Sequence, residues 1–127
     1  MNVAIVGATG YGGMQAVNLL KNNKNYNISF LGGNKTSGSR WNEKFPFIYL
    51  EANPVIEKIS VENISKESDI ALLSLPNGIS STLTRRLLEK GIKVIDLSAD
   101  YRYKSLEEWE KVYSKEAYIY KRNDYDL

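Results

Sequence analysis

Apolar and polar residues alternate along this chain in two periods, one typical of strands and one typical of helices. Short apolar runs predict buried strands at 3–6, 69–75 and 92–97. A second strand is predicted at 27–31, and alternating residues predict a short strand at 55–59. Apolar residues at three- and four-residue spacing predict helices over 11–23 and 79–90, the second with Ile79, Leu83 and Leu87 on its inner face. A capping box predicts another helix from Ser105 onward. Residues 34–54 follow neither period. Because strands alternating with helices favour right-handed parallel crossovers, the predicted fold is α/β with a doubly wound parallel sheet.

This predicted architecture also indicates where a ligand would bind. In doubly wound sheets, ligands lie beyond the carboxyl ends of the strands, near the point where the strand order reverses. The predicted strands place four loops at that edge: 7–13, 32–40, 76–78 and 98–102. We expect these loops to converge on one crevice.

The first loop is a glycine-rich turn between a strand and a helix, Gly7-Ala8-Thr9-Gly10-Tyr11-Gly12-Gly13. Glycines permit a tight turn, close approach of the backbone to a pyrophosphate, and close packing of helix on sheet. The helix N-terminus adds unpaired N–H groups and a partial positive charge, which favour an anion. The spacing G-x-x-G-x-x-G differs from the commonest dinucleotide fingerprint, and a glycine-rich stretch is also compatible with a plain turn.

Length and composition narrow the functional class. The chain has 127 residues and a formal net charge of +2, which suits one globular domain with no strong attraction to nucleic acid or membrane. It has no cysteine and no histidine, which excludes a thiol nucleophile, an imidazole base and the usual zinc site. No apolar run is long enough to span a bilayer and no signal segment opens the chain, so we expect a cytoplasmic protein.

Charge is distributed unevenly along the chain. Residues 1–42 contain no acid, and their basic residues are Lys21, Lys24, Lys35 and Arg40. Such a segment favours an anionic ligand near the start of the fold. Lysines that coat a helix end and a loop by chance are the alternative.

The loop at 32–40 bears on the choice between NAD and NADP. Folds that bind NAD place an acid about 20 residues past the glycine turn to bind the ribose, whereas a 2′-phosphate needs cationic or hydroxyl partners. This loop contains no acid and offers Lys35, Thr36 and Ser37. We therefore expect NADP as the cofactor. A flexible polar loop whose lysine faces water is the alternative.

The loop at 98–102 contains an arginine, Arg102, that can bind a carboxylate or a phosphate through two parallel hydrogen bonds. Asp96 or Asp100 could hold this arginine in place, or the arginine could face a substrate anion. The residues leave both roles open. A pair of acid–base carboxylates at Asp96 and Asp100 is less favoured than partnership with Arg102 and the backbone.

Three elements together resemble the N-terminal part of the N-acetyl-gamma-glutamyl-phosphate reductases, which are relatives of aspartate-semialdehyde dehydrogenase. These elements are the glycine turn, Leu75-Pro76-Asn77-Gly78, and Asp96-Leu97-Ser98-Ala99-Asp100-Tyr101-Arg102. They follow one another in the family's order and spacing over nearly the whole chain, and the last is the most specific. The resemblance implies that residues 1–127 form a Rossmann-like NADP-binding domain. It also implies that the chain stops before the catalytic cysteine and the substrate and dimerisation domain.

The resemblance further implies an activity and a set of site residues. The family uses NADPH to reduce N-acetyl-gamma-glutamyl phosphate to N-acetylglutamate semialdehyde in arginine biosynthesis, through a thioester on a cysteine and with help from a histidine. The implied pyrophosphate site consists of Gly7, Thr9, Gly10, Tyr11, Gly12 and Gly13. The implied 2′-phosphate site consists of Lys35, Thr36 and Ser37, and Leu75 and Pro76 are implied at the ribose. Ser98 and Arg102 are implied near the substrate.

Several departures from the family limit this interpretation. Asn77 stands where the family usually has a histidine, and Gly12 where a hydroxyl residue is common. Without a cysteine no acyl-enzyme can form, so we expect no turnover by this chain alone and assign it no catalytic residue. The expected partners are a small-molecule acyl phosphate in the complete enzyme, and a homo-oligomer or a C-terminal half. A noncatalytic nucleotide- or protein-binding module and a piece of a carrier-linked aminoadipyl phosphate reductase are the alternatives.

Overall fold

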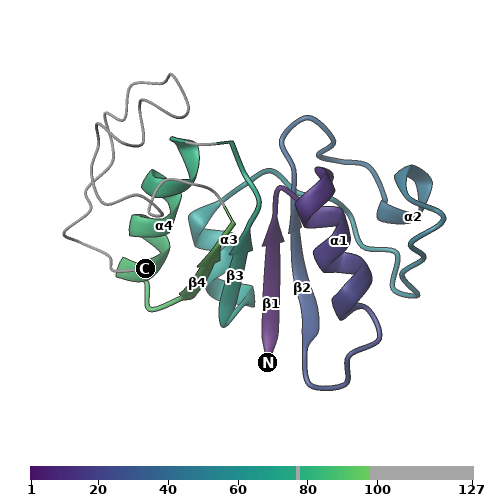
Figure 1. The fold of residues 1–127 in the computed structure, drawn as a ribbon, viewed down its shortest axis with the longest axis horizontal. Helices are drawn as coiled ribbons and strands as arrows, with labels where there is room; N and C mark the ends of the chain where they lie inside the picture. Colours follow the sequence, from purple (N-terminus) through teal and green to yellow (C-terminus); the bar gives the residue numbers. More distant parts are fainter. Residues whose placement is uncertain (77, 98–127) are drawn as a thin grey trace.

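A computed structural model of the chain describes residues 1–76 and 78–97, which form one sheet with helices on both faces. In chain order the elements are β1 (Asn2–Val6), α1 (Tyr11–Leu20), β2 (Asn27–Gly32), α2 (Trp41–Lys44), α3 (Val61–Glu67), β3 (Ile70–Leu73), α4 (Ile79–Glu89) and β4 (Lys93–Asp96). The strands pair in parallel in the order β2-β1-β3-β4 (Figure 1). The predicted α/β fold with a doubly wound parallel sheet is confirmed.

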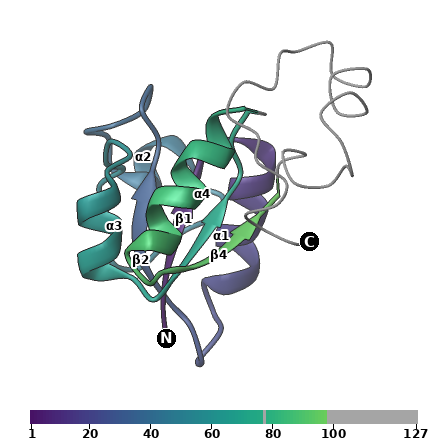
Figure 2. The same ribbon diagram turned by 90° about the vertical axis from the view of Figure 1, so that its left-hand side faces the viewer.

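Successive side chains of the central strand β1 point to opposite faces of the sheet, so the core is divided into two clusters, one on each face. Val3 and Ile5 belong to a cluster that includes Val17 of α1, whereas Ala4 and Val6 belong to a cluster with residues of α3 and α4. Figure 2 shows α1 and α3 on opposite sides of the sheet. Within residues 1–76 and 78–97, no helix is long and apolar enough to cross a membrane.

The strand order reverses between β1 and β3. From β1 the chain crosses to β2 on one side, and after β2 it returns past β1 to form β3 on the other. The carboxyl ends of β1 and β3 therefore flank the point where doubly wound folds bind ligands. The segments that follow these strands are the predicted loops that begin at Gly7 and at Pro76.

The strand predicted at 55–59 is wrong. Val55 pairs antiparallel with Arg40, whereas Glu57 pairs parallel with Gly32, so two single bridges in opposite senses replace a continuous ladder. The following helix α3 was not predicted; it begins after Ser60, whose side chain accepts a hydrogen bond from the Asn63 N–H at 3.2 Å. Apart from α2, the other described strands and helices occur where predicted, with ends that differ by a few residues. The helix predicted from Ser105 lies outside the described residues.

Residues 41–54, predicted as irregular, contain the short helix α2 and pack as an ordered lobe on the α1 side of the sheet. Trp41 is fully buried, donates its Nε1–H to the Ile48 carbonyl at 2.7 Å, and stacks on Phe45 with 4.3 Å between the ring centroids. The Asn42 side chain bonds both backbone groups of Leu50, at 2.8 and 2.9 Å. These side-chain bonds give the lobe its order in place of a long helix or strand.

Candidate functional site

The glycine turn after β1 is wedged between the ends of β2 and β3. Gly7 has a φ of +83°, and an added Cβ there would lie 2.1 Å from the Ser74 carbonyl oxygen. The N–H groups of Gly7 and Ala8 both donate to the Gly32 carbonyl, at 2.8 and 3.0 Å. The loops that follow β1, β2 and β3 therefore meet, as predicted. The fourth predicted loop, 98–102, lies outside the described residues, as does Asn77.

The start of α1 packs directly on this turn. An added Cβ at Gly13 would lie 2.1 Å from the Gly7 carbonyl oxygen and 2.7 Å from the Ala8 Cα. At Gly10 the nearest atom would be 3.6 Å away, an ordinary contact. Close packing therefore requires glycine at positions 7 and 13, whereas Gly10 serves as the N-cap of α1.

Two helices, α1 and α4, begin at this edge of the sheet. α1 is capped by Gly10 and α4 by Gly78, and neither cap has a side-chain hydrogen bond or an acid in the first helical turn. By contrast, Ser60 caps α3, which has Glu62 in its first turn. Because unpaired N–H groups and the helix dipole favour negative charge, the N-terminus of α1 suits an anionic group. Tyr11, the first residue of α1, is 88% exposed.

A serine at the end of β3 adds a hydroxyl to the glycine turn. An added Cβ at Gly12 would lie 2.5 Å from the Ser74 Oγ, so the missing side chain at Gly12 leaves room for that hydroxyl beside the first turn of α1. The Ser74 N–H donates to the Val6 carbonyl at 2.8 Å, which fixes its place at the switch point. Sequence reasoning missed Ser74; its one signal is a polar residue within the apolar run at 70–75.

The loop after β2 is tied down by its own side chains. The Asn34 Oδ1 accepts the Ile59 N–H at 3.0 Å, and the Ser37 hydroxyl donates to the Asn34 carbonyl at 3.0 Å. The Thr36 Oγ1 is buried without a hydrogen-bond partner in the described part of the chain, and it lies 2.8 Å from the position of a Cβ at Gly33. Lys35 is exposed.

Thr9 and Leu75 adjoin this loop and the glycine turn. The Thr9 Cγ2 would lie 3.6 Å from a Cβ at Gly33, and the Leu75 Cδ2 would lie 3.2 Å from a Cβ at Gly7. Leu75 and Asn34 also line a cavity of about 350 Å³ that extends over α4. Pro76, exposed, follows Leu75 at the same edge.

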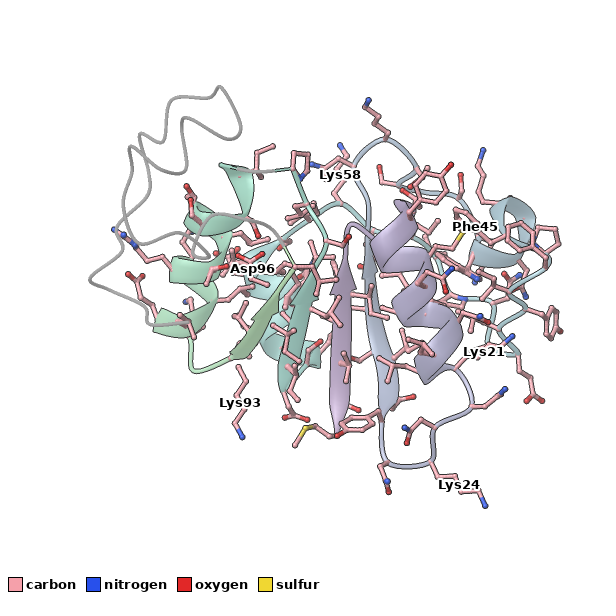
Figure 3. All side chains as sticks on the ribbon, in the orientation of Figure 1. Lys21, Lys24, Phe45, Lys58, Lys93 and Asp96 are labelled. Carbon is pink, nitrogen blue, oxygen red and sulfur yellow. The ribbon has the colours of Figure 1, made fainter. Side chains whose placement is uncertain are left out.

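The basic residues of the acid-free segment do not gather at this site. Lys21 and Lys24 follow the C-terminus of α1, and Figure 3 shows Lys24 beyond the amino ends of the strands. The Arg40 guanidinium donates to the Asn53 carbonyl at 3.1 Å. Of these four residues, Lys35 and Arg40 lie in the loop after β2, and the Arg40 guanidinium is already bound to Asn53. An anionic ligand at the carboxyl ends of the strands would therefore meet Lys35 rather than the whole group of basic residues.

A glutamate lies close to the same loop in the structure, although not in the sequence. The Gly33 N–H donates to the Glu57 carbonyl at 2.9 Å. Burial, and to a lesser extent the nearby Glu67 carboxylate, raises the pKa of the Glu57 side chain. Its carboxyl group therefore keeps a proton to a higher pH than that of an exposed glutamate.

Asp96, at the end of β4, binds α4. Its carboxylate accepts from the Ser80 hydroxyl at 2.7 Å and from the Thr84 hydroxyl at 3.4 Å, and both of these residues are buried. Ile79, predicted to face the core, is 56% exposed, because the inner face of α4 uses these hydroxyls beside Leu83 and Leu87. Asp96 thus has a structural role between strand and helix. Asp100, Ser98 and Arg102 lie outside the described residues.

Replacing Asp96 with alanine should lower the free energy of unfolding by about 1–3 kcal/mol, because two buried hydroxyls lose their acceptor. Urea denaturation followed by circular dichroism measures this change. Asp96→Asn keeps one side-chain oxygen as acceptor and should lower the free energy of unfolding by less. Equal losses for the two variants would contradict the role assigned to the carboxylate.

Comparison with known proteins agrees with this geometry. Residues 2–121 match the family model described as semialdehyde dehydrogenase, NAD binding domain. The chain is 84% identical over its whole length to an N-acetyl-gamma-glutamyl-phosphate reductase of Prochlorococcus marinus (strain MIT 9312), and 53% identical over 98% of its length to that of strain NATL1A. It covers 36% and 35% of those two proteins, so it spans about a third of the curated relatives it matches.

Solved structures show the same fold. Aspartate semialdehyde dehydrogenase with NADP from Candida albicans superposes with a TM-score of 0.69 at 20% identity, over 83% of this chain and 31% of that one. Aspartate semialdehyde dehydrogenase II complexed with ASA from Vibrio cholerae gives 0.63 at 25% identity, over 81% of this chain and 29% of that one. The family match covers the glycine turn, the loop after β2 and the Ser74 hydroxyl described above. The chain therefore belongs to the semialdehyde dehydrogenase NAD-binding domain family.

Proposed function

We propose that this chain is the NADPH-binding domain of a reductase that converts N-acetyl-gamma-glutamyl phosphate to N-acetylglutamate semialdehyde in arginine biosynthesis. The observation that carries the proposal is the glycine turn, wedged against the Ser74 carbonyl and open at the N-terminus of α1. The identity of the chain to reductases of that name over its whole length supports the choice of substrate.

The residues at the carboxyl ends of the strands fit a dinucleotide. The first N–H groups of α1, reached from Thr9 through Gly13, would bind the pyrophosphate, and Ser74 would add a hydroxyl beside them. Leu75 and Pro76 would contact the ribose. When bound, NADPH would supply the hydride, while these residues bind and orient it.

The loop after β2 fits the 2′-phosphate that distinguishes NADP from NAD. The Thr36 Oγ1 is buried without a partner in the described part of the chain, and a buried hydroxyl without a partner costs about 1–3 kcal/mol. A phosphate oxygen near Gly33 would accept from it. Lys35 and Ser37 would supply an ammonium group and a second hydroxyl.

In the proposed function, the residues described above do not bind the acyl phosphate, and this chain does not supply the thiol. The chain has no cysteine, so a thioester cannot form on it. We place Ser98 and Arg102 near the substrate, and the thiol in a further segment or partner. Mixing the chain with NADPH and N-acetyl-gamma-glutamyl phosphate should therefore give nucleotide binding without oxidation of NADPH.

Replacing Lys35 with alanine should weaken NADPH binding by about tenfold and leave NADH binding unchanged, because one charge-assisted hydrogen bond to the 2′-phosphate is lost. Titration of each reduced nucleotide, followed by its fluorescence, measures both affinities. Lys24→Ala is the matched control, since it removes the same charge at the opposite end of the sheet. A folded wild-type chain that binds neither nucleotide would overturn the proposed function.

A further inference from the structure

We propose that Arg86 of α4, together with Asn34, recognises the adenine ring of the dinucleotide in the cavity beside the glycine turn. This inference rests on the proposed function and adds a specificity residue on a helix where the sequence showed no site. The cavity of about 350 Å³ is lined by both residues and lies between the loop after β2 and α4.

The walls of the cavity suit a flat apolar ring. Leu75, Ile79 and Leu83 line it, and Ile79 is 56% exposed although it begins a helix in a well-packed domain. A ligand that covered Ile79 would remove this apolar surface from water. The volume lies at the low end of the range for ligand pockets, about 300–1,000 Å³, which suits one end of a dinucleotide.

Asn34 supplies a donor at the rim of the cavity. Because its Oδ1 accepts the Ile59 N–H at 3.0 Å, the amide group is held with its NH₂ as the remaining polar group. No hydrogen bond from that NH₂ occurs within residues 1–76 and 78–97. Ring nitrogens of adenine are acceptors, so a donor at this place fits them. Asn34 also precedes Lys35, which connects the cavity to the proposed 2′-phosphate site.

Arg86 supplies a planar cation at the α4 side of the same cavity. Among the described residues, none forms an ion pair or a hydrogen bond with its guanidinium. A guanidinium plane stacks on aromatic rings better than an ammonium group does, so an unpaired arginine over an apolar wall favours a heteroaromatic ligand. The geometry therefore assigns Arg86 to the ring and leaves the 2′-phosphate to Lys35.

Titrating Arg86→Ala with NADPH and with NADH tests this assignment. Because both nucleotides contain adenine, the variant should bind both of them more weakly by the same factor, about three- to tenfold. Arg86→Lys, which keeps the charge but not the plane, should recover little of the loss. Lys90→Ala, an exposed change at the C-cap of α4 away from the cavity, should leave both affinities unchanged.

The outcomes separate this inference from the proposed function. A loss confined to NADPH, or full recovery by Arg86→Lys, would assign Arg86 to the phosphate and overturn the inference. Unchanged binding in Arg86→Ala would overturn it as well, while the proposed function would stand on the wild-type affinities. Arg86 is exposed, so the variant should keep the wild-type unfolding midpoint, which urea denaturation checks.

Discussion

Replacing Gly7 with alanine is expected to lower the free energy of unfolding by at least about 2 kcal/mol and to abolish NADPH binding. The new Cβ would lie 2.1 Å from the Ser74 carbonyl oxygen, and this neighbour is backbone, which cannot rotate away. To relieve this steric conflict, β1 and β3 would have to move apart at the switch point, where the proposed pyrophosphate site lies. Urea denaturation and fluorescence titration with NADPH measure the two effects.

Gly38→Ala is the matched control for this substitution. Gly38 has a φ of +92°, close to the +83° of Gly7, but a Cβ there would meet no atom within 4 Å. Both variants share the strain of a left-handed residue, about 1–2 kcal/mol, and only Gly7→Ala adds the steric conflict. Equal losses of stability in the two variants would show that the contact with Ser74 contributes nothing.

The sequence could predict the parts of the fold that depend on local patterns. The apolar segments around Val3, Ile28, Ala71 and Val94 become the four parallel strands. The central strands β1 and β3 are the most apolar, because helices cover both of their faces. The glycine turn was predicted for the same reason: turn, strand and helix follow one another within a few residues. The convergence of three loops then follows from the strand order alone.

Parts of the site that depend on distant contacts could not be predicted. Ser74 adjoins the turn only because Gly12 lacks a side chain. Arg86 and Asn34 line one cavity only because the fold brings α4 beside the loop after β2. Periodicity also misjudged Ile79, since it counts apolar side chains and cannot foresee that Asp96 satisfies buried hydroxyls on the other face of the helix. Such pairs are set by tertiary structure and leave no local pattern.

The order of the lobe at 41–54 also depends on distant contacts and could not be predicted from local patterns. This lobe holds the backbone that borders the loop after β2. The Trp41 N–H donates to the Pro54 carbonyl at 2.9 Å, and two residues later Ile56 donates its N–H to the Ser39 carbonyl at 2.8 Å. Glu57, next in the chain, then accepts the Gly33 N–H. The backbone at 54–57 therefore connects the lobe to the proposed 2′-phosphate site.

Trp41→Ala should lower the free energy of unfolding by about 3–5 kcal/mol, because it empties a fully buried site and removes both the stacking on Phe45 and the bond to Ile48. Trp41→Phe keeps an aromatic ring and should lose less, with the missing Nε1–H donor as its main cost. Urea denaturation compares the two variants. If Trp41→Phe binds NADPH normally while Trp41→Ala, still folded at low temperature, binds it weakly, the lobe supports the loop by packing. Normal binding by a folded Trp41→Ala chain would mean that the loop after β2 keeps its shape without the lobe.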